Sequence, residues 1–331
     1  MKAIVHENKS GIPGLSYREM EKPEISSEEC LLKVNVGGLN RRDVAVIENK
    51  HDPDSGPFIP GSDAFGVVAE AGEGVTSVSE GDEVVVYPGL GWDEKSDAPP
   101  KGYEIVGFPD DGTFAEHIKI PAKNLAKKPG HLTSEEAGVL SLAALTAYRV
   151  LFTRANIQKG DTILLPGIGS GVLTFALKFA KAIGARVIVT SRSEDKQKQA
   201  LELGADKAID TYEDWNAALA EETVDVVVES IGKQTFQKSI DIVRRGGTIV
   251  TFGATTEDII ELDIRSFFYG QYNLLGSTMG SMEEWKEMLQ FVEEKDIRPV
   301  MDKIFDATDC QEAFAYIKES KNLGKLGLKF N

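Results

Sequence analysis

The sequence predicts an α/β protein made of a β-rich domain and a second domain built on a doubly wound parallel sheet. A chain of 331 residues is long enough for both domains. Short apolar segments separated by glycines fill residues 1–125. Strand-like and helix-like segments alternate over residues 126–265. Within that region, a glycine-rich turn joins an apolar strand to an amphipathic helix.

The first domain, residues 1–125, is expected to be compact and barrel-like. Glycines between residues 61 and 81 supply turns and bends between short strands. The predicted strands are residues 4–5, 31–36, 66–69, 83–87 and 115–120. Residues 88–109 are polar and rich in Gly and Pro, which is typical of a long surface loop.

The second domain, residues 126–265, shows a different rhythm. Thr133 and Glu136 have the spacing of a capping box, and a helical pattern continues from there through Val150. The strands predicted next are 163–165, 186–190, 207–209, 224–229 and 248–252, and the helices are 171–183, 194–203, 213–220 and 234–243. This alternation is typical of a parallel sheet with helices on both faces.

The tail, residues 266–331, lacks this alternation and is expected to return to the first domain. It contains a predicted strand at 273–276, helices at 282–293 and 310–318, and a last strand at 325–330.

Composition and charge exclude several classes of partner. The formal net charge is −16, with 53 acidic and 37 basic residues, which repels nucleic acid and anionic lipid. We find no apolar run near the roughly 18 residues of a membrane span, and no signal-peptide pattern. The two cysteines, Cys30 and Cys310, are too far apart to indicate a disulfide framework or a zinc motif. We therefore expect a cytoplasmic protein that acts on a small molecule.

The glycine-rich turn is the strongest functional signal. It runs from Pro166 through Gly167, Gly169, Ser170 and Gly171 to Val172, between an apolar strand and a helix with one apolar stripe. Small residues there let backbone N–H groups at a helix N-terminus approach a pyrophosphate. The context predicts dinucleotide binding.

The end of the second strand favours NADPH. An NAD site carries an acidic residue there, whereas the position is Ser191 here, followed by Arg192 and then Lys196. A 2′-phosphate is bound by hydroxyl and cationic groups, which these residues supply. The alternative is that Arg192 is only a solvated residue at the start of a helix.

Several segments together resemble the medium-chain dehydrogenase/reductase superfamily, and specifically its zinc-lacking, quinone-oxidoreductase-like branch. The resemblance covers nearly the whole chain. The segments that carry it are 38–43 (GLNRRD), 60–63 (PGSD), 66–68 (GVV), 81–84 (GDEV), 112–116 (GTFAE), 144–148 (ALTAY), 203–206 (LGAD) and 324–325 (GK). It implies a GroES-like catalytic domain around a Rossmann domain, and a homodimer is common in the family.

The resemblance also implies that metal ligands have been lost. Zinc-dependent members carry Cys, His and Glu where this chain has Asn40, Ser62 and Asp63, and a Cys or Asp near Leu142. They carry four cysteines in the loop at 88–109, which has none here. We therefore predict no metal site. Asn40, Ser62 and Asp63 become the catalytic candidates, with Asn40 as a hydrogen-bond donor to the acceptor oxygen or the cofactor ribose; the alternative is that they are turn residues beside Gly61.

The same resemblance assigns further cofactor contacts. Thr146 should bind the nicotinamide carboxamide, and Gly169 to Val172 the pyrophosphate. Residues at the ends of three later strands should line the nicotinamide half: Ser230, Ile231, Phe252, Gly253, Ala254, Ser277, Thr278 and Met279. Leu173 departs from the small residue that is usual in the family. This difference implies either one extra residue in the loop or a helix that stands further from the sheet.

These predictions favour an NADPH-dependent oxidoreductase that reduces a quinone or an α,β-unsaturated carbonyl without a metal. One alternative is a reductase of enoyl thioesters, aldehydes or ketones on the same scaffold. Another is an NADPH-binding redox sensor with little turnover. The sequence leaves all three open.

Overall fold

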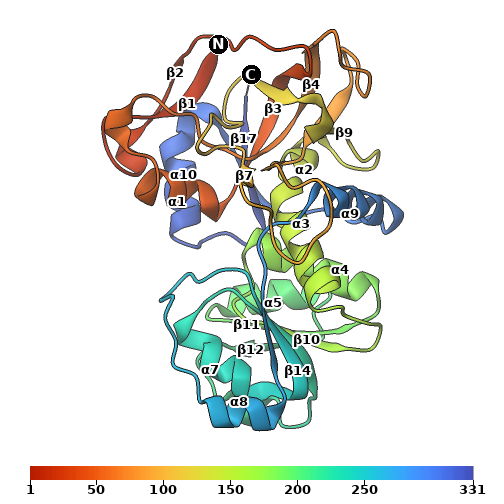
Figure 1. Cartoon of the computed structure of the whole chain (residues 1–331). Coiled ribbons are helices and arrows are strands. Elements are labelled where there is room, and N and C mark those ends of the chain that lie inside the picture. Colours follow the sequence, from red (N-terminus) through yellow and green to blue (C-terminus); the bar gives the residue numbers. More distant parts are fainter. Residues whose placement is uncertain (331) are drawn as a thin grey trace. The chain divides into compact units, whose positions relative to one another are not determined.

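The computed structural model describes residues 1–330 and consists of two compact units (Figure 1). Unit 1 comprises residues 1–145 and the chain from residue 280 onward, and unit 2 is Thr146–Met279. The sequence places the divisions near residues 125 and 265. The first division lies later because the helix α2 (Ser134–Gly138) packs on β3 (Glu29–Leu39) and β4 (Asp63–Ala71) of unit 1.

Unit 1 is built on a seven-stranded sheet. Its order is β16–β17–β3–β4–β5–β9, and β8 pairs with β3. The bounds of the strands not yet given are β5 Glu83–Val86, β8 His117–Pro121, β9 Leu125–Lys127, β16 Met301–Asp306 and β17 Lys325–Lys329. Two smaller pairs complete the unit: β1 (Lys2–His6) with β2 (Leu15–Glu19), and β6 (Gly89–Leu90) with β7 (Glu104–Ile105).

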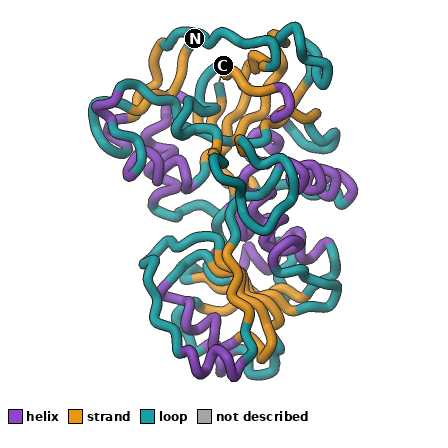
Figure 2. Tube along the Cα trace, in the orientation of Figure 1, coloured by secondary structure: helices purple, strands orange, loops and turns teal. Residues whose placement is uncertain are grey.

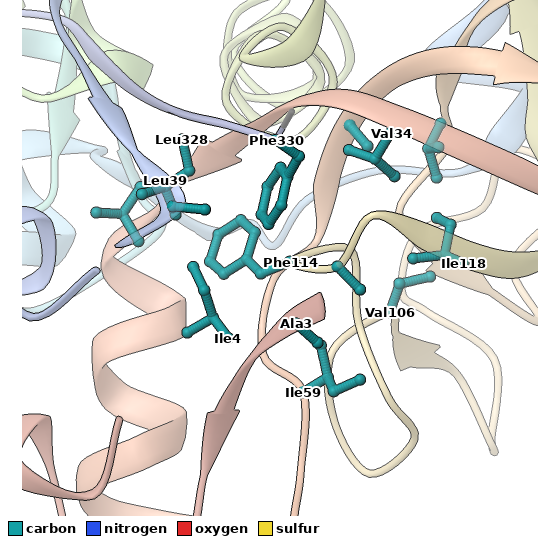
Figure 3. Packing of buried hydrophobic residues seen from close by; sticks show 14 of the residues in the cluster. Ala3, Ile4, Val34, Leu39, Ile59, Val106, Phe114, Ile118, Leu328 and Phe330 are labelled. Atoms are coloured by element: carbon teal, nitrogen blue, oxygen red, sulfur yellow. The ribbon is translucent and has the colours of Figure 1, made fainter. Parts of the chain in front are cut away.

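The core of unit 1 joins residues from both ends of the chain. Figure 3 shows Phe114 beside Phe330 and near Ile4 and Leu328. Phe114 also meets Phe314 of α10 (Cys310–Lys318) edge to face, with 6.2 Å between ring centroids. The other helices of this unit are α1 (Arg41–Asn49), α9 (Met282–Glu294) and the start of α3 (Ser141–Tyr148). The C-terminal segment is thus an integral part of unit 1.

One glycine in β3 allows the close packing that shapes the candidate site. Gly38 pairs with Asp63 of β4 and Gly327 of β17. A Cβ at Gly38 would lie 2.7 Å from the carbonyl oxygen of Gly138 and 2.8 Å from Cβ of Asp63. A side chain is therefore excluded where the helix α2 crosses the sheet.

Unit 2 contains a six-stranded parallel sheet with the order β12–β11–β10–β13–β14–β15. Figure 2 shows its strands in orange, with helices in purple beside them. The strand order is that of a Rossmann fold, numbered 3-2-1-4-5-6. The strands are β10 Thr162–Leu165, β11 Arg186–Ser191, β12 Lys207–Asp210, β13 Val224–Glu229, β14 Val243–Thr251 and β15 Asn273–Gly276. The helices are α4 Gly171–Ala182, α5 Glu194–Glu202, α6 Trp215–Ala218, α7 Lys233–Ile242 and α8 Ile264–Gly270.

The strand β15 corrects the prediction for the tail. The sequence assigns residues 266–279 to the returning tail, but β15 pairs in parallel with β14 and extends the sheet of unit 2. The preceding helix α8 has one buried residue, Gly270, so it shows no apolar stripe from which the continued alternation could be recognised.

Other differences concern element boundaries. The helix predicted from Thr133 through Val150 divides into α2, α3 and a π-helical segment at Arg149–Arg154. The strands that the sequence does not predict are β2, β6, β7, β9 and β16, and the α-helices that it does not predict are α1 and α8. Among residues 1–330, no helix has the length and apolar character of a membrane span.

Candidate active site

The side chain of Asn40 is held between two charged residues. Asn40 follows the end of β3 and precedes α1, and its backbone N–H donates to Oδ2 of Asp43 at 2.7 Å. Its Nδ2 donates to Oδ2 of Asp63 at 3.0 Å and to the carbonyl oxygen of Gly38 at 3.2 Å. Its Oδ1 accepts from Nζ of Lys325 at 2.6 Å. Both amide hydrogens are therefore in use, so the predicted role of Asn40 as a donor to an acceptor oxygen or a ribose would require one of these bonds to open. That role stays a prediction.

Asp63, the first residue of β4, is fully buried, and both of its carboxylate oxygens accept hydrogen bonds. Oδ1 accepts from the backbone N–H of Leu142 at 2.7 Å, and Oδ2 accepts from Asn40 and from Nζ of Lys325 at 3.4 Å. Lys325 is itself 2% exposed, and burial lowers the pKa of its ammonium. A buried ion pair of this kind is tolerated only because both partners are hydrogen-bonded.

Asp43 completes what we name the polar cluster: Asn40, Asp43, Asp63 and Lys325. Burial raises the pKa of Asp43 to about 7. Its Oδ1 is buried without a hydrogen-bond partner among residues 1–330. The carboxyl group of Asp43 therefore changes charge near neutral pH, beside the ion pair of Asp63 and Lys325.

Ser62 lies at the edge of this cluster and is paired with Arg42. The Ser62 hydroxyl donates to the carbonyl oxygen of Val106 at 2.8 Å and accepts from NH1 of Arg42 at 2.9 Å. NH1 and NH2 of Arg42 also donate to the carbonyl oxygens of Val106 and Ile105, each at 3.1 Å. Ser62 is fully buried, whereas Arg42 keeps partial exposure.

The residues at the metal-ligand positions do not fit zinc. Zinc is bound by Cys, His and carboxylate side chains. These positions hold an amide, a hydroxyl, an aliphatic side chain and only one carboxylate, that of Asp63, which is paired with Lys325. Within residues 1–330, no group of three or more His, Cys, Asp or Glu side chains is arranged to bind a metal ion. Cys30 and Cys310 are both buried, free thiols.

The loop at 88–109 is held by hydrogen bonds to the start of α9. The backbone N–H of Met282 donates to the carbonyl oxygen of Trp92 at 2.9 Å. That carbonyl also accepts from the Tyr87 hydroxyl at 3.0 Å. The ammonium of Lys95 pairs with Glu287 of α9 at 2.8 Å. These contacts supply cross-links in a loop that has no cysteines.

The glycine turn of unit 2 has the backbone shape of a pyrophosphate cradle. Gly167 and Gly169 have φ angles of 74° and 148°, a region that other residues rarely adopt. A Cβ at Gly167 would lie 2.6 Å from Cδ1 of Ile231. Ser170 caps α4, and its Oγ accepts from the backbone N–H of Leu173 at 3.2 Å. This site fits a dinucleotide.

The turn leads directly into α4, whose first three residues are Gly171, Val172 and Leu173. Leu173 is buried with 1% exposure, so its larger side chain packs inside unit 2.

The other predicted cofactor residues of unit 2 gather at one edge of its sheet. Ser230 and Ile231 follow β13, Phe252 to Ala254 follow β14, and Ser277 to Met279 follow β15, all at carboxyl ends of neighbouring parallel strands. The Ser277 Oγ is buried without a hydrogen-bond partner among the described residues. Thr146 is buried in α3. Ligands of open α/β sheets bind at this edge.

The residues predicted to select NADPH lie at the end of β11. Ser191 is its last residue, 4% exposed, and its Oγ accepts from the backbone N–H of Ser193 at 3.1 Å. Arg192 is exposed directly after it, and Lys196 is half-buried in the first turn of α5. Both cationic residues thus follow the carboxyl end of β11, which is the second strand of this sheet along the chain.

Sequence reasoning missed three residues of this region: Arg42, Asp43 and Lys325. Lys325 alone offered a signal, because it is a charged residue within the apolar pattern of a terminal strand. Arg42 and Asp43 belong to a polar run, NRRD at 40–43, that gives no indication of which side chains point inward.

Comparison with known proteins agrees with this architecture. A family profile described as "Alcohol dehydrogenase GroES-like domain" matches residues 26–130, and one described as "Zinc-binding dehydrogenase" matches residues 171–294. A zinc-type alcohol dehydrogenase-like protein of Schizosaccharomyces pombe is 32% identical, over 100% of this chain and 99% of its own. The chain belongs to the medium-chain dehydrogenase/reductase superfamily.

Other members of the superfamily are similar over their whole length. The crystal structure of an NAD-dependent alcohol dehydrogenase has a TM-score of 0.94 at 33% identity and covers 100% of both chains. An acryloyl-coenzyme A reductase of Metallosphaera sedula is 28% identical over 98% of this chain and 99% of its own. The predicted fold class, a GroES-like domain with a Rossmann domain, is confirmed, and the chain is an oxidoreductase of this superfamily.

Proposed function

We propose that this oxidoreductase uses NADPH, without zinc, to reduce α,β-unsaturated carbonyl compounds and quinones, with enoyl thioesters among the acceptors. The observation that carries the proposal is the polar cluster. At the positions where zinc-dependent relatives bind their metal, this chain has an amide and a carboxylate that are bonded to each other and to a buried lysine.

The choice of acceptor follows from what such a site can do. Without a Lewis acid it cannot strongly polarise an unactivated alcohol or ketone. When bound, a reduced nicotinamide supplies a hydride to an electron-poor carbon, while a proton from water completes the reduction. An enone, an enoyl thioester or a quinone delocalises the arriving charge, so positioning by the protein contributes most of the rate. The similarity to an acryloyl-coenzyme A reductase supports the enoyl thioester as one acceptor.

The choice of NADPH rests on the end of β11. Ser191 places a hydroxyl where an acidic side chain would repel a 2′-phosphate, and Arg192 stands exposed beside it. The glycine turn holds the pyrophosphate through backbone N–H groups at the start of α4. We assign Thr146, Ser230, Ile231, Phe252 to Ala254 and Ser277 to Met279 to the nicotinamide half.

We also propose a homodimer. The strand β15 is an edge of the parallel sheet and leaves Leu274 38% exposed. The preceding α8 exposes Phe268 and Tyr269 by 49% and 59%. An edge strand beside exposed aromatic residues is open to pairing with another chain. Light scattering after size-exclusion chromatography tests this, and a monomer at micromolar concentration would contradict it.

A reducing compartment such as the cytoplasm suits this enzyme. Cys30 and Cys310 lie buried as free thiols, and burial raises the pKa of both. Neither is activated for oxidation, because the reactive form of a cysteine is the thiolate.

The deciding experiment measures oxidation of NADPH and of NADH with a small quinone, an enone and an enoyl thioester. Oxidation of simple primary alcohols with NADP is the comparison, and elemental analysis gives the zinc content. We expect turnover with conjugated acceptors, preference for NADPH and no stoichiometric zinc. Good alcohol turnover with about one zinc per chain would refute the proposal. Tight NADPH binding with no turnover would indicate a redox sensor instead.

A further inference from the structure

The hydrogen-bonding capacity of the predicted catalytic residues is consumed inside unit 1. Asn40 uses both amide hydrogens and its oxygen, Ser62 donates and accepts, and both oxygens of Asp63 accept hydrogen bonds. All three are buried. They can support a site, but a different group must contact the acceptor.

Arg42 has the properties that these three residues lack. It is the second residue of α1, and its guanidinium is fixed by Ser62 and by the carbonyl oxygens of Ile105 and Val106. Among residues 1–330, these bonds use three of the five N–H groups of a guanidinium. Arg42 is half-buried, and its other two N–H groups have no hydrogen-bond partner among the described residues.

The charge of Arg42 is only partly compensated by its neighbours. Asp43 and Tyr103 are the titratable groups that act on it. Because the pKa of Asp43 is raised to about 7, its carboxyl group neutralises Arg42 only in part. A guanidinium stays protonated in proteins even where burial lowers its pKa. The site therefore holds a fixed positive charge next to Ser62, one of the positions of a metal ligand in zinc-dependent relatives.

We propose that Arg42 is a catalytic residue that binds the carbonyl oxygen of the acceptor. This inference rests on the proposed function. Addition of hydride to the β-carbon moves the C=C electron pair toward the carbonyl, and the oxygen becomes an enolate until water protonates the α-carbon. The free N–H groups of Arg42 stabilise that oxyanion, as fixed donors do in other enzymes. Arg42 thus supplies the positive charge that a metal supplies elsewhere.

The test compares Arg42→Gln and Arg42→Lys with Arg18→Gln, which removes a half-exposed arginine in β2 that pairs with Glu7. We expect Arg42→Gln to lower kcat/KM for an enone by about 100-fold to 1,000-fold, and Arg42→Lys to lower it less. The loss should be smaller for a quinone, which stabilises the charge itself. The Kd for NADPH and the unfolding midpoint should change little, and Arg18→Gln should match the unmodified enzyme.

Three outcomes would overturn the inference. One is full enone activity in folded Arg42→Gln. Another is an equal loss with every acceptor together with a lower unfolding midpoint, which indicates that Arg42 only anchors residues 105 and 106. The third is that the unmodified enzyme reduces no conjugated acceptor, in which case the proposed function fails first.

A second measurement needs no variant at Arg42. Butanoate and butanamide serve as inhibitors of the unmodified enzyme. They have the same carbon chain, but butanoate has a negatively charged oxygen, like the enolate, and butanamide has a neutral one. If Arg42 binds the oxyanion, butanoate should inhibit enone reduction at least tenfold more strongly than butanamide. Equal inhibition by the two compounds would contradict the inference.

Discussion

The polar cluster of unit 1 and the glycine turn of unit 2 use polar groups in opposite ways. In the cluster, Asn40, Asp63 and Lys325 satisfy one another and are closed to solvent. In unit 2, the turn presents backbone N–H groups at the start of α4, and Ser277 keeps a buried hydroxyl without a partner among residues 1–330. Groups that bond to one another, as Asn40, Asp63 and Lys325 do, form a scaffold. A buried polar atom without a partner among residues 1–330, such as Oδ1 of Asp43 or Oγ of Ser277, indicates a place for a proton or a ligand.

The largest effect on stability should come from removing one charged residue of the polar cluster. Lys325→Met leaves the Asp63 carboxylate buried without its cation, and we expect a loss of about 3–5 kcal/mol in the free energy of unfolding by urea. Lys325→Met combined with Asp63→Asn should recover most of that loss. The control Lys123→Met removes an exposed ion pair with Asp93 and should cost at most about 1 kcal/mol. Equal losses in the two lysine variants would show that the cluster is not a stabilising scaffold.

The next largest effect is expected at the cofactor site of unit 2, where Arg192 is assigned to the 2′-phosphate. Arg192→Ala should weaken NADPH binding by about 1.5–3 kcal/mol, a factor of ten or more, and leave NADH binding nearly unchanged. Isothermal titration with both cofactors measures it. The exposed Lys198 of α5 provides the control, because Lys198→Ala removes a nearby cation that we do not assign to the phosphate. Similar weakening of NADH would reject a specific contact between Arg192 and the 2′-phosphate.

A third variant tests the backbone of the turn. Gly167→Ala should lower the free energy of unfolding by about 1–3 kcal/mol, because an alanine is strained at φ 74° and meets Ile231. It should also weaken NADPH binding. Gly160→Ala is the matched control: its φ is 92°, but nothing lies within 4 Å of the added Cβ. If both variants bind NADPH equally well, the turn is not the pyrophosphate site.

The smallest effect is a pH dependence of stability from Asp43. Its folded pKa of about 7 lies above the ordinary aspartate value of 3.8, so the folded state binds a proton that the unfolded state releases. Its contribution is present at lower pH and is lost as the pH rises through 7, by about 1.4 kcal/mol between pH 6 and pH 8. Asp43→Asn should flatten this part of the profile. A slope unchanged by the substitution would assign it to other groups.

Three histidines, His6, His51 and His117, act in the opposite direction at lower pH, because burial lowers the pKa of each. The Nδ1 atoms of His6 and His51 lie 2.7 Å apart. The unfolded state therefore binds more protons below the ordinary pKa of about 6.5, and stability falls as the pH decreases from there. The pH profile of Asp43→Asn should keep this acid limb, which separates the two contributions.

Much of the fold could be predicted from the sequence because its signals are local. The strand, glycine turn and helix at 163–183 carry their periodicity and turn chemistry within about 20 residues. The elements that were missed lack such signals. The helix α8 buries only Gly270, and α1 begins in a charged run, NRRD.

The candidate site was less predictable than the fold, because its contacts join residues that are far apart in the sequence. Asn40, Ser62 and Asp63 do lie together, as the resemblance implies, but their roles depend on partners that the local sequence does not identify. Whether the amide of Asn40 is free or occupied depends on Asp63 and Lys325, and the free donors of Arg42 depend on where residues 105 and 106 pass.

The sequence by itself determined the fold class, the dinucleotide turn and the residue types at the metal-ligand positions, because each is set by spacing along a short segment. Only the tertiary structure decided that Lys325 is the cation of Asp63. The two residues are 262 positions apart, and the pairing of β17 with β3 and of β3 with β4 brings them within 3.4 Å. Strand register over such a distance is fixed by the packing of the whole sheet, and a buried charge takes the partner that this packing provides.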